Sequence, residues 1–226
     1  MIDISSGSSH SLALDRSGKV YSWGNGQGGR LGHDAEVGEN LPRHIKSLKE
    51  YVKQIEAGDA SSACLTSSDN TYLWGSGLNG RLGNGTSTNQ NEPQKSQELK
   101  EKQVSQIAKG TNTTFAILKT SPSVVMAWGS SKNGKLGFPL ANGKNYDLPK
   151  EVISLKDIEI YQIAAGPFHT LLLTVDGKLY SMGNSKDGKL GYETVGASVV
   201  DVALPEKIPM RNVTFFRVQV AKTEIK

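Results

Sequence analysis

Residues 5–32 of the chain read SSGSSHSLALDRSGKVYSWGNGQGGRLG, and recognisably the same stretch returns three more times. The copies open at Gly7, Gly58, Gly110 and Gly166, so the period is 51, then 52, then 56 residues. Self-similarity of this length is typical of solenoids, propellers and other repeat arrays. The 226-residue chain is therefore expected to form one repeat architecture rather than two unrelated domains.

Two further anchors recur in register with the opening glycine. A large apolar residue followed at once by glycine recurs at Trp23-Gly24, Trp74-Gly75, Trp128-Gly129 and Met182-Gly183. A basic residue inside a Gly-Arg/Lys-Leu-Gly turn recurs at Arg30, Arg81, Lys135 and Lys189. Because the anchors agree, we expect repeats at residues 2–51, 52–103, 104–159 and 160–212, with a partial fifth copy at 213–226.

Each copy predicts four short β-strands. Segments such as 52–57 and 160–165 alternate apolar and polar residues before the opening glycine, which indicates a half-buried strand. An apolar strand, a tight turn and a strand rich in aromatic and β-branched residues follow. The segments between copies contain the prolines Pro42, Pro93, Pro149 and Pro205, which suit a fourth, edge strand. Four strands per unit of about fifty residues predict an all-β protein built of propeller blades.

The composition narrows the classes of function. The 26 basic and 22 acidic residues are scattered, so the net charge of +4 predicts a mildly basic solvated surface rather than a tail that binds nucleic acid directly. The single cysteine, Cys64, cannot form an intrachain disulfide and favours a reducing compartment. The sequence shows neither a secretory leader nor an apolar run of roughly 18 residues, so we expect a cytoplasmic or nuclear protein without membrane insertion.

Two glycine-rich runs, residues 24–29 and 75–80, satisfy the G-x-G-x-x-G pattern of dinucleotide sites. Such a site has to open a helix whose N-terminus faces the pyrophosphate. Here Gly32 and Gly83 follow almost at once, which opposes a helix. We therefore expect these glycines to bend the chain between strands and to bind no cofactor.

The histidines give no sign of a metal or catalytic site. His10 and His169 share one repeat position, and the second and third copies carry Ser61 and Thr113 there. We expect the two histidines to form a buried hydrogen bond that fixes the loop after the first strand, because a zinc site needs three or four suitably spaced ligands. Since no nucleophile has a local partner base and no carboxylate pair recurs, we expect no enzymatic activity.

The recurring basic residues suggest a binding surface. Repeat symmetry is expected to bring them to one face, where a basic ring would attract an acidic partner. The candidate partner-binding residues are Arg30, Arg81, Lys135 and Lys189.

The order of these features resembles the repeat of the regulator of chromosome condensation family. The shared features are the opening glycine, a histidine three residues later, an apolar strand, a turn, a strand ending in Trp-Gly, and the Gly-Arg/Lys-Leu-Gly turn. The resemblance covers roughly residues 2–191 and implies a seven-bladed β-propeller. Since seven blades of this period need about 360 residues, we expect an incomplete ring, completed by a missing segment. Completion by another chain, or a small closed ring in which the last strand joins the first blade, are the alternatives.

The resemblance implies two classes of function. One is a protein-interaction scaffold whose blade-face loops bind partner proteins, as in the ubiquitin ligases and ciliary proteins that use this repeat. The other is a guanine-nucleotide exchange factor for a Ran-like small GTPase, which needs a wedge-like hairpin inserted in one repeat. The only insertion is two residues near Pro122, so we rank the scaffold first and keep the exchange factor as the alternative. A plant ultraviolet receptor with this fold depends on extra clustered tryptophans, which the sequence lacks.

Overall fold

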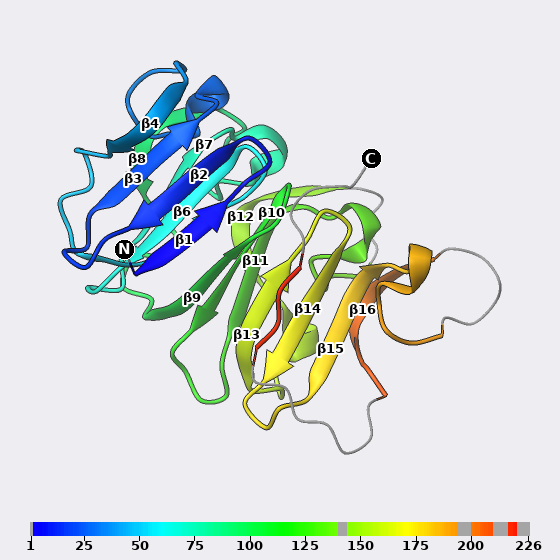
Figure 1. Ribbon diagram of the computed structural model, residues 1–226. Helices are drawn as coiled ribbons and strands as arrows, with labels where there is room; N and C mark the ends of the chain where they lie inside the picture. The colour runs from blue at the N-terminus through cyan, green and yellow to red at the C-terminus, as the bar shows by residue number, and fades with distance from the viewer. Residues whose placement is uncertain (1, 140–143, 194–199, 210–216, 221–226) are drawn as a thin grey trace.

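The computed structural model describes residues 2–139, 144–193, 200–209 and 217–220. Within these residues the chain forms four antiparallel sheets, and each sheet is an up-and-down meander of four strands (Figure 1). Each sheet corresponds to one copy of the repeat, and the sheets are named blades 1 to 4. The expected all-β architecture of four-stranded propeller blades is confirmed.

The strand bounds follow the repeat. Blade 1 contains β1 (Asp3–Ser6), β2 (His10–Leu14), β3 (Val20–Gly24) and β4 (Glu39–His44). Blade 2 contains β5 (Val52–Ala57), β6 (Ser61–Thr66), β7 (Thr71–Gly75) and β8 (Gln90–Lys95). Blade 3 contains β9 (Val104–Lys109), β10 (Thr113–Leu118), β11 (Val125–Ser130) and β12 (Asn145–Glu151). Blade 4 contains β13 (Ile160–Ala165), β14 (His169–Thr174), β15 (Leu179–Asn184) and β16 (Asp201–Lys207).

The hydrophobic core lies between neighbouring blades rather than within one sheet. Leu12 and Leu14 of blade 1 pack in one cluster with Ile55 and Trp74 of blade 2. The clusters between blades 2 and 3 and between blades 3 and 4 are built in the same way. The first strands of consecutive blades, β1, β5, β9 and β13, contact one another in that order and form the inner wall of the array (Figure 1).

The glycine that follows each tryptophan position has a conformation that other residues rarely adopt. Gly75 has a φ of 99° and Gly129 a φ of 101°. A Cβ on Gly75 would also lie 2.7 Å from the Cα of Ser61. The third strand therefore turns sharply here, into a three-residue 3-10 turn instead of the helix that a dinucleotide site needs, as the sequence predicts.

Residues 217–220 lie beside the inner strand of blade 4. Their contact is made by the Gln162 side chain, which hydrogen bonds to the backbone of Val218. The rest of the predicted fifth copy, 213–216 and 221–226, lies outside the described residues. Among the described residues the sheet of blade 1 consists of β1–β4 alone, and residues 217–220 are not part of it. The alternative in which the last strand joins the first blade falls largely on residues outside the described ones and stays a prediction.

Candidate functional site

A shared hydrogen-bond acceptor links blade 1 to blade 2. The backbone carbonyl of Arg30, in the Gly-Arg-Leu-Gly turn of blade 1, accepts hydrogen bonds from two groups of blade 2. The Ser62 hydroxyl donates over 2.8 Å and the Trp74 indole Nε1 over 3.1 Å. We name this two-donor arrangement the carbonyl latch. Because both donor side chains are fully buried, the latch replaces hydrogen bonds to water that these groups lose when the blades pack.

The carbonyl latch recurs between blades 2 and 3. The carbonyl of Arg81 accepts from Thr114 Oγ1 at 2.8 Å and from Trp128 Nε1 at 3.1 Å. Between blades 3 and 4 the carbonyl of Lys135 accepts from Thr170 Oγ1 at 2.9 Å. Met182 stands at the tryptophan position of blade 4, and its thioether has no hydrogen to donate. The third latch therefore has one side-chain donor instead of two.

The latch hydroxyl is itself held by a second donor. His10 is buried, and its Nε2 lies 2.9 Å from Ser62 Oγ. Because the hydroxyl gives its only hydrogen to Arg30, the histidine nitrogen has to be the donor. The expected buried hydrogen bond of His10 is confirmed, but the bond crosses to the next blade instead of fixing its own loop.

A different residue supplies this second donor where the histidine is absent. Blade 2 has Ser61 at the histidine position, and the buried Lys109 of the next inner strand reaches the latch instead. Its Nζ lies 3.0 Å from Thr114 Oγ1. His169 of blade 4 is half-buried, and burial followed by the charge of Lys189 lowers its pKa. No hydrogen bond of its ring is found in the part of the chain that the structure describes.

The four recurring basic side chains are not equivalent. Arg81 and Lys135 are each only 3% exposed, and both donate to carbonyls of the next blade, Thr111 at 3.2 Å and Pro167 at 2.7 Å. Arg30 is half-buried and bonds to Gln27 and Ser9. Lys189 is half-buried, beside Asp187 and over the ring of Phe168. Their role in binding an acidic partner stays a prediction, and the geometry supports it best for Arg30 and Lys189.

A glutamine ladder, which the sequence analysis missed, joins the inner strands. The amide of Gln54 donates to the carbonyl of Ile107 at 2.8 Å and accepts from its N–H at 3.1 Å. Gln162 makes the same pair of bonds to Val218, at 3.2 and 3.0 Å, and Gln106 accepts from Ile163 at 3.0 Å. The available signal was a glutamine four residues before the opening glycine in copies two, three and four.

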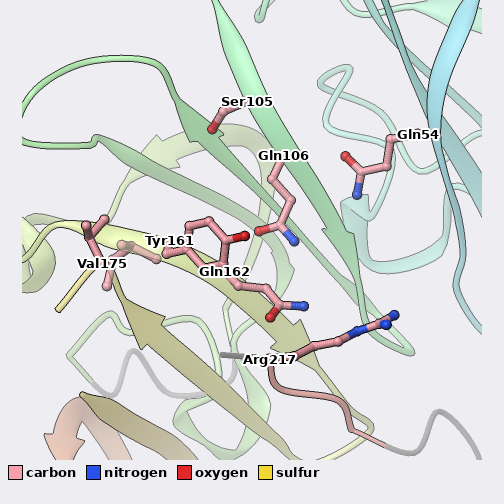
Figure 2. A pocket seen from close by; sticks show the side chains of 8 residues that line it. Gln54, Ser105, Gln106, Tyr161, Gln162, Val175 and Arg217 are labelled. Carbon is pink, nitrogen blue, oxygen red and sulfur yellow. The ribbon is translucent and has the colours of Figure 1, made fainter. Parts of the chain in front are cut away.

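Two hollows lie along the inner strands. One hollow of about 490 Å³ is lined by the glutamine ladder, Tyr161, Val175 and Arg217 (Figure 2). Another of about 560 Å³ runs along the inner strands from Asp3 to Val220. In the first hollow the Gln54 and Gln162 amides are bonded to backbone groups, and the Arg217 side chain and the exposed Tyr161 ring also line the space.

No catalytic or metal-binding geometry is found in the described residues. They contain no group of three or more His, Cys, Asp or Glu side chains able to hold a metal ion. Cys64 is buried as a free thiol, and burial raises its pKa far above the ordinary value, so the reactive thiolate is suppressed. The Ser22 hydroxyl lies 2.9 Å from His33 Nε2, but it donates its hydrogen to the carbonyl of Leu31 at 2.7 Å, so the histidine does not act as its base in this arrangement. No helix among the described residues is long and apolar enough to span a bilayer.

Meandering four-stranded blades, latched in sequence around inner strands, define a β-propeller of the repeat type. Models of the regulator of chromosome condensation (RCC1) repeat match residues 17–65, 68–117 and 124–173, and a second model of this repeat matches residues 1–30 and 160–189. The chain belongs to the RCC1 repeat family.

Similar proteins share the repeat over most of this chain. The human E3 ubiquitin-protein ligase HERC2 is 35% identical over 84% of this chain, which spans 4% of that protein. The ultraviolet-B receptor UVR8 of Arabidopsis thaliana is 32% identical over 92% of this chain and 46% of the receptor. The structure of human WBSCR16 matches with a TM-score of 0.78 at 25% identity, over 91% of this chain and 51% of that one. Yeast RCC1 (Prp20), solved with Kap60, has the same TM-score at 22% identity, over 92% and 48%.

Trp74→Phe should lower the free energy of unfolding by about 1–3 kcal/mol, because the Arg30 carbonyl loses one of its two donors and the core loses packed surface. Trp23→Phe is the matched control. It makes the same change at the same repeat position, but the half-buried Trp23 indole bonds to no carbonyl among the described residues. Urea unfolding followed by circular dichroism should show the smaller loss for the control, and equal losses would contradict the latch.

Lys135 should make stability rise with pH. Burial, helped by the charges of Arg81 and Lys132, lowers its pKa to about 8 from the ordinary 10.5. Below pH 8 the Lys135 side chain is charged in both the folded and the unfolded chain, so folding carries the full cost of burying that charge. Between pH 8 and 10.5 the unfolded chain binds more protons than the folded chain, so stability rises with pH. The free energy of unfolding of the native chain, relative to that of Lys135→Met, should therefore rise by about 2–3 kcal/mol from about pH 7.5 to 10. Parallel pH profiles would show that Lys135 titrates normally.

Proposed function

We propose that the chain is a protein-interaction scaffold that binds partner proteins through loops on one face of its blades and catalyses no reaction itself. The observation that carries this proposal is that the residues shared by the copies contact neighbouring blades, whereas residues that differ between copies remain accessible. The tryptophans, the latch hydroxyls, the buried basic residues and the glutamines serve contacts between blades. The residues left for function are those that differ between copies and remain accessible.

The accessible loops of the four blades lie at one end of the strands. The N–H of Asn25, after β3, donates to the carbonyl of Ser9, before β2, at 2.8 Å, and Ser76 and Ala60 make the equivalent bond in blade 2. The loops before the second strands and the turns after the third strands therefore share one surface, which we name the loop face. It is formed by residues 8–9 and 25–28, 59–60 and 76–79, 111–112 and 130–133, and 167–168 and 184–187.

The loop face presents different chemistry at each blade. Two exposed apolar side chains lie on it: Leu78, 58% exposed, and Phe168, 36% exposed. The positions equivalent to Leu78 carry Gln27, Lys132 and Lys186, and those equivalent to Phe168 carry Ser9, Ala60 and Asn112, so no other blade has a large apolar side chain at either position. Apolar side chains on an otherwise polar surface are typical anchors of protein–protein contacts, and their restriction to single blades makes the face specific.

The activities in the names of the relatives do not transfer directly. This chain spans 4% of the human ligase and 46% of the plant receptor. Trp74 and Trp128 are committed to carbonyl latches, which gives no support to a light-sensing role.

No contact in the described residues favours an exchange factor over a scaffold. The free thiol of Cys64 suits the cytoplasm or nucleus, which imaging of the tagged protein would check.

We further propose that another blade of the same repeat type covers the face of blade 1 that points away from blade 2. The face carries Ser11 and Trp23, which correspond to the latch donors of the following blades. Both side chains are half-buried, and neither donates to a carbonyl within the described residues. Ile4 on the same blade is 75% exposed. A neighbouring Gly-Arg/Lys-Leu-Gly turn, from a further segment or another chain, supplies the acceptor that these donors fit.

The double variant Leu78→Glu/Phe168→Glu should lose at least one partner protein that copurifies with the wild type. Two buried carboxylates would oppose an apolar contact there. The control is Ile153→Glu, which places one carboxylate at a 63% exposed apolar residue on the link between blades 3 and 4, away from the loop face. Quantitative mass spectrometry of the captured proteins measures the difference. The same partner set for all three proteins would contradict the scaffold role of the loop face.

The exchange-factor alternative has its own measurement. Release of labelled nucleotide from a Ran-type GTPase should not be accelerated by the protein, because nothing in the described residues forms an inserted wedge. Acceleration by a factor of about a hundred or more, a catalytic effect of nearly 3 kcal/mol, would replace the scaffold by the exchange factor.

Hydroxyl-radical footprinting tests the covered face of blade 1. In the protein as it is assembled in the cell, Trp23 should be oxidised as slowly as Trp74, which serves as the internal reference in the same sample. The 226-residue chain alone should show faster oxidation of Trp23, because its indole is only half-buried there. Fast oxidation of Trp23 in the assembled protein would contradict a neighbouring blade.

A further inference from the structure

We propose that a groove at the end of blade 1 opposite the loop face docks an acidic segment of a partner protein. The groove is a hollow of about 560 Å³ whose wall includes Lys19, Lys46 and Lys49, with Tyr51 at its side. A smaller hollow of about 90 Å³ adjoins it and shares His44 and Lys46 with it. We name the two together the blade 1 groove. It adds a second surface to the proposed scaffold and does not involve the loop face.

The backbone holds the basic residues in place. They come from the hairpin before β3, the end of β4 and the link from 45 to 51. Ile45 is fully buried, and its N–H donates to the carbonyl of Val20 at 2.9 Å. At the other end of the link, the N–H of Val52 donates to the carbonyl of Gly18 at 3.2 Å. The groove is therefore part of the blade and not a loose loop.

An aromatic ring forms part of the groove. Tyr51 packs against Gly18, where a Cβ would lie 2.6 Å from the ring, and its hydroxyl donates to the carbonyl of Arg16 at 3.0 Å. The Tyr51 residue stays 49% exposed. A ring fixed in this way offers apolar surface at little further cost in conformational freedom.

The positive charge of the groove is not neutralised from within. Lys19, Lys46 and Lys49 are exposed and form no ion pair among the described residues. Two acidic residues line the groove: Glu50 and, in the smaller hollow, Glu92, which is half-buried and forms no ion pair among the described residues. Glu50 faces blade 2, where Asn70, Tyr72 and Thr66 donate to it at 2.7, 2.7 and 3.0 Å.

Two carboxylates close to the groove are already committed. Burial acts to raise the pKa of Glu50, but the hydrogen bonds from blade 2 outweigh burial and the net shift is downward. The nearby Asp15 carboxylate accepts from the backbone and hydroxyl of Ser17 and from the N–H of Lys19 in its own turn. Both carboxylates are thus ionised but satisfied, and the lysine ammonium groups are left for an external anion.

The fold does not require this charge. The bond from Ile45 to Val20 recurs as Ser96 to Thr71 in blade 2 and Val152 to Val125 in blade 3, which aligns the three links. In this alignment, the positions of Lys19, His44, Lys46 and Lys49 are occupied by Asn70, Lys95, Gln97 and Lys100 in blade 2 and by Val124, Glu151, Ile153 and Lys156 in blade 3. The concentration of basic residues belongs to blade 1 alone among these three.

The dimensions favour an acidic peptide over a nucleic acid. A duplex presents about one charge every 1.7 Å along its axis and needs an extended basic track. The groove offers three lysines around a compact hollow with an aromatic side. Carboxylates set close to an apolar side chain match this surface, and desolvation in the hollow strengthens their pairing with the ammonium groups.

The test measures binding of a fluorescein-labelled peptide of four glutamates around one leucine by fluorescence anisotropy. The variant Lys19→Gln/Lys46→Gln/Lys49→Gln should weaken binding about ten-fold or more at low salt. The control, Lys100→Gln/Lys156→Gln/Lys178→Gln, removes the same net charge from equivalent positions in other blades and should change the affinity by less than about two-fold. All six substitutions are at the surface, and thermal melting confirms that both variants remain folded.

Each other outcome overturns the proposal. If both triple variants bind the peptide equally more weakly, the peptide is attracted by the net charge of the protein and not by the groove. If neither variant binds more weakly, the groove is not the binding site. Tighter binding of a single-stranded DNA of the same charge, lost in the groove variant, would assign the groove to nucleic acid. The Leu78→Glu/Phe168→Glu variant should still bind the peptide, so failure of the groove and failure of the loop face are separately visible.

Discussion

The backbone carbonyl of the basic residue in the first three Gly-Arg/Lys-Leu-Gly turns is the acceptor on which the packing of one blade against the next depends. It projects from one blade and is reached by a hydroxyl and, in two cases, an indole of the following blade. Leaving a buried carbonyl without a partner costs about 1–3 kcal/mol. The turn therefore has to be held in one position relative to the next sheet. The Arg81 and Lys135 side chains do this by donating to carbonyls of that same sheet.

This constraint explains why the anchors of the repeat stay in register. A change in the spacing between the tryptophan and the basic turn would move donor and acceptor apart at two successive interfaces. The residue that donates a hydrogen bond to the latch hydroxyl differs between blades. His10 supplies it from the preceding blade, and Lys109 supplies it from the following inner strand where Ser61 replaces the histidine. Ser61 therefore replaces the histidine without loss of the hydrogen bond, whereas no second donor to Thr170 Oγ1 is found among the described residues where Thr113 replaces it.

The local features of the fold could be predicted from the sequence, and the contacts between blades could not. The bounds of β5 and β13 match the alternating segments 52–57 and 160–165, because strand period and turn glycines act over a few residues. The bond from His10 to Ser62 joins residues 52 positions apart, and no local pattern reports its direction. Basic residues in turns are usually solvated, so the burial of Arg81 and Lys135 was visible only with the next blade in place. The glutamine ladder escaped notice because a polar residue on an alternating strand looks like ordinary solvent exposure.

The glutamine ladder also distinguishes the flanks of the array from its middle. A glutamine amide both donates and accepts, so Gln54 and Gln162 can bind both backbone groups of one residue on the neighbouring strand. The first copy has Asp3 at this position, which only accepts when ionised, and residues 217–220 place Arg217 there, which only donates. Neither can reproduce the paired bonds. Asp3 accepts from its own neighbour Ile4, and the Ser5 hydroxyl takes over the contact to blade 2 by accepting from Ala57. The contact between the first two copies is therefore made by a hydroxyl that accepts one hydrogen bond, whereas Gln54 and Gln162 each form a pair of bonds.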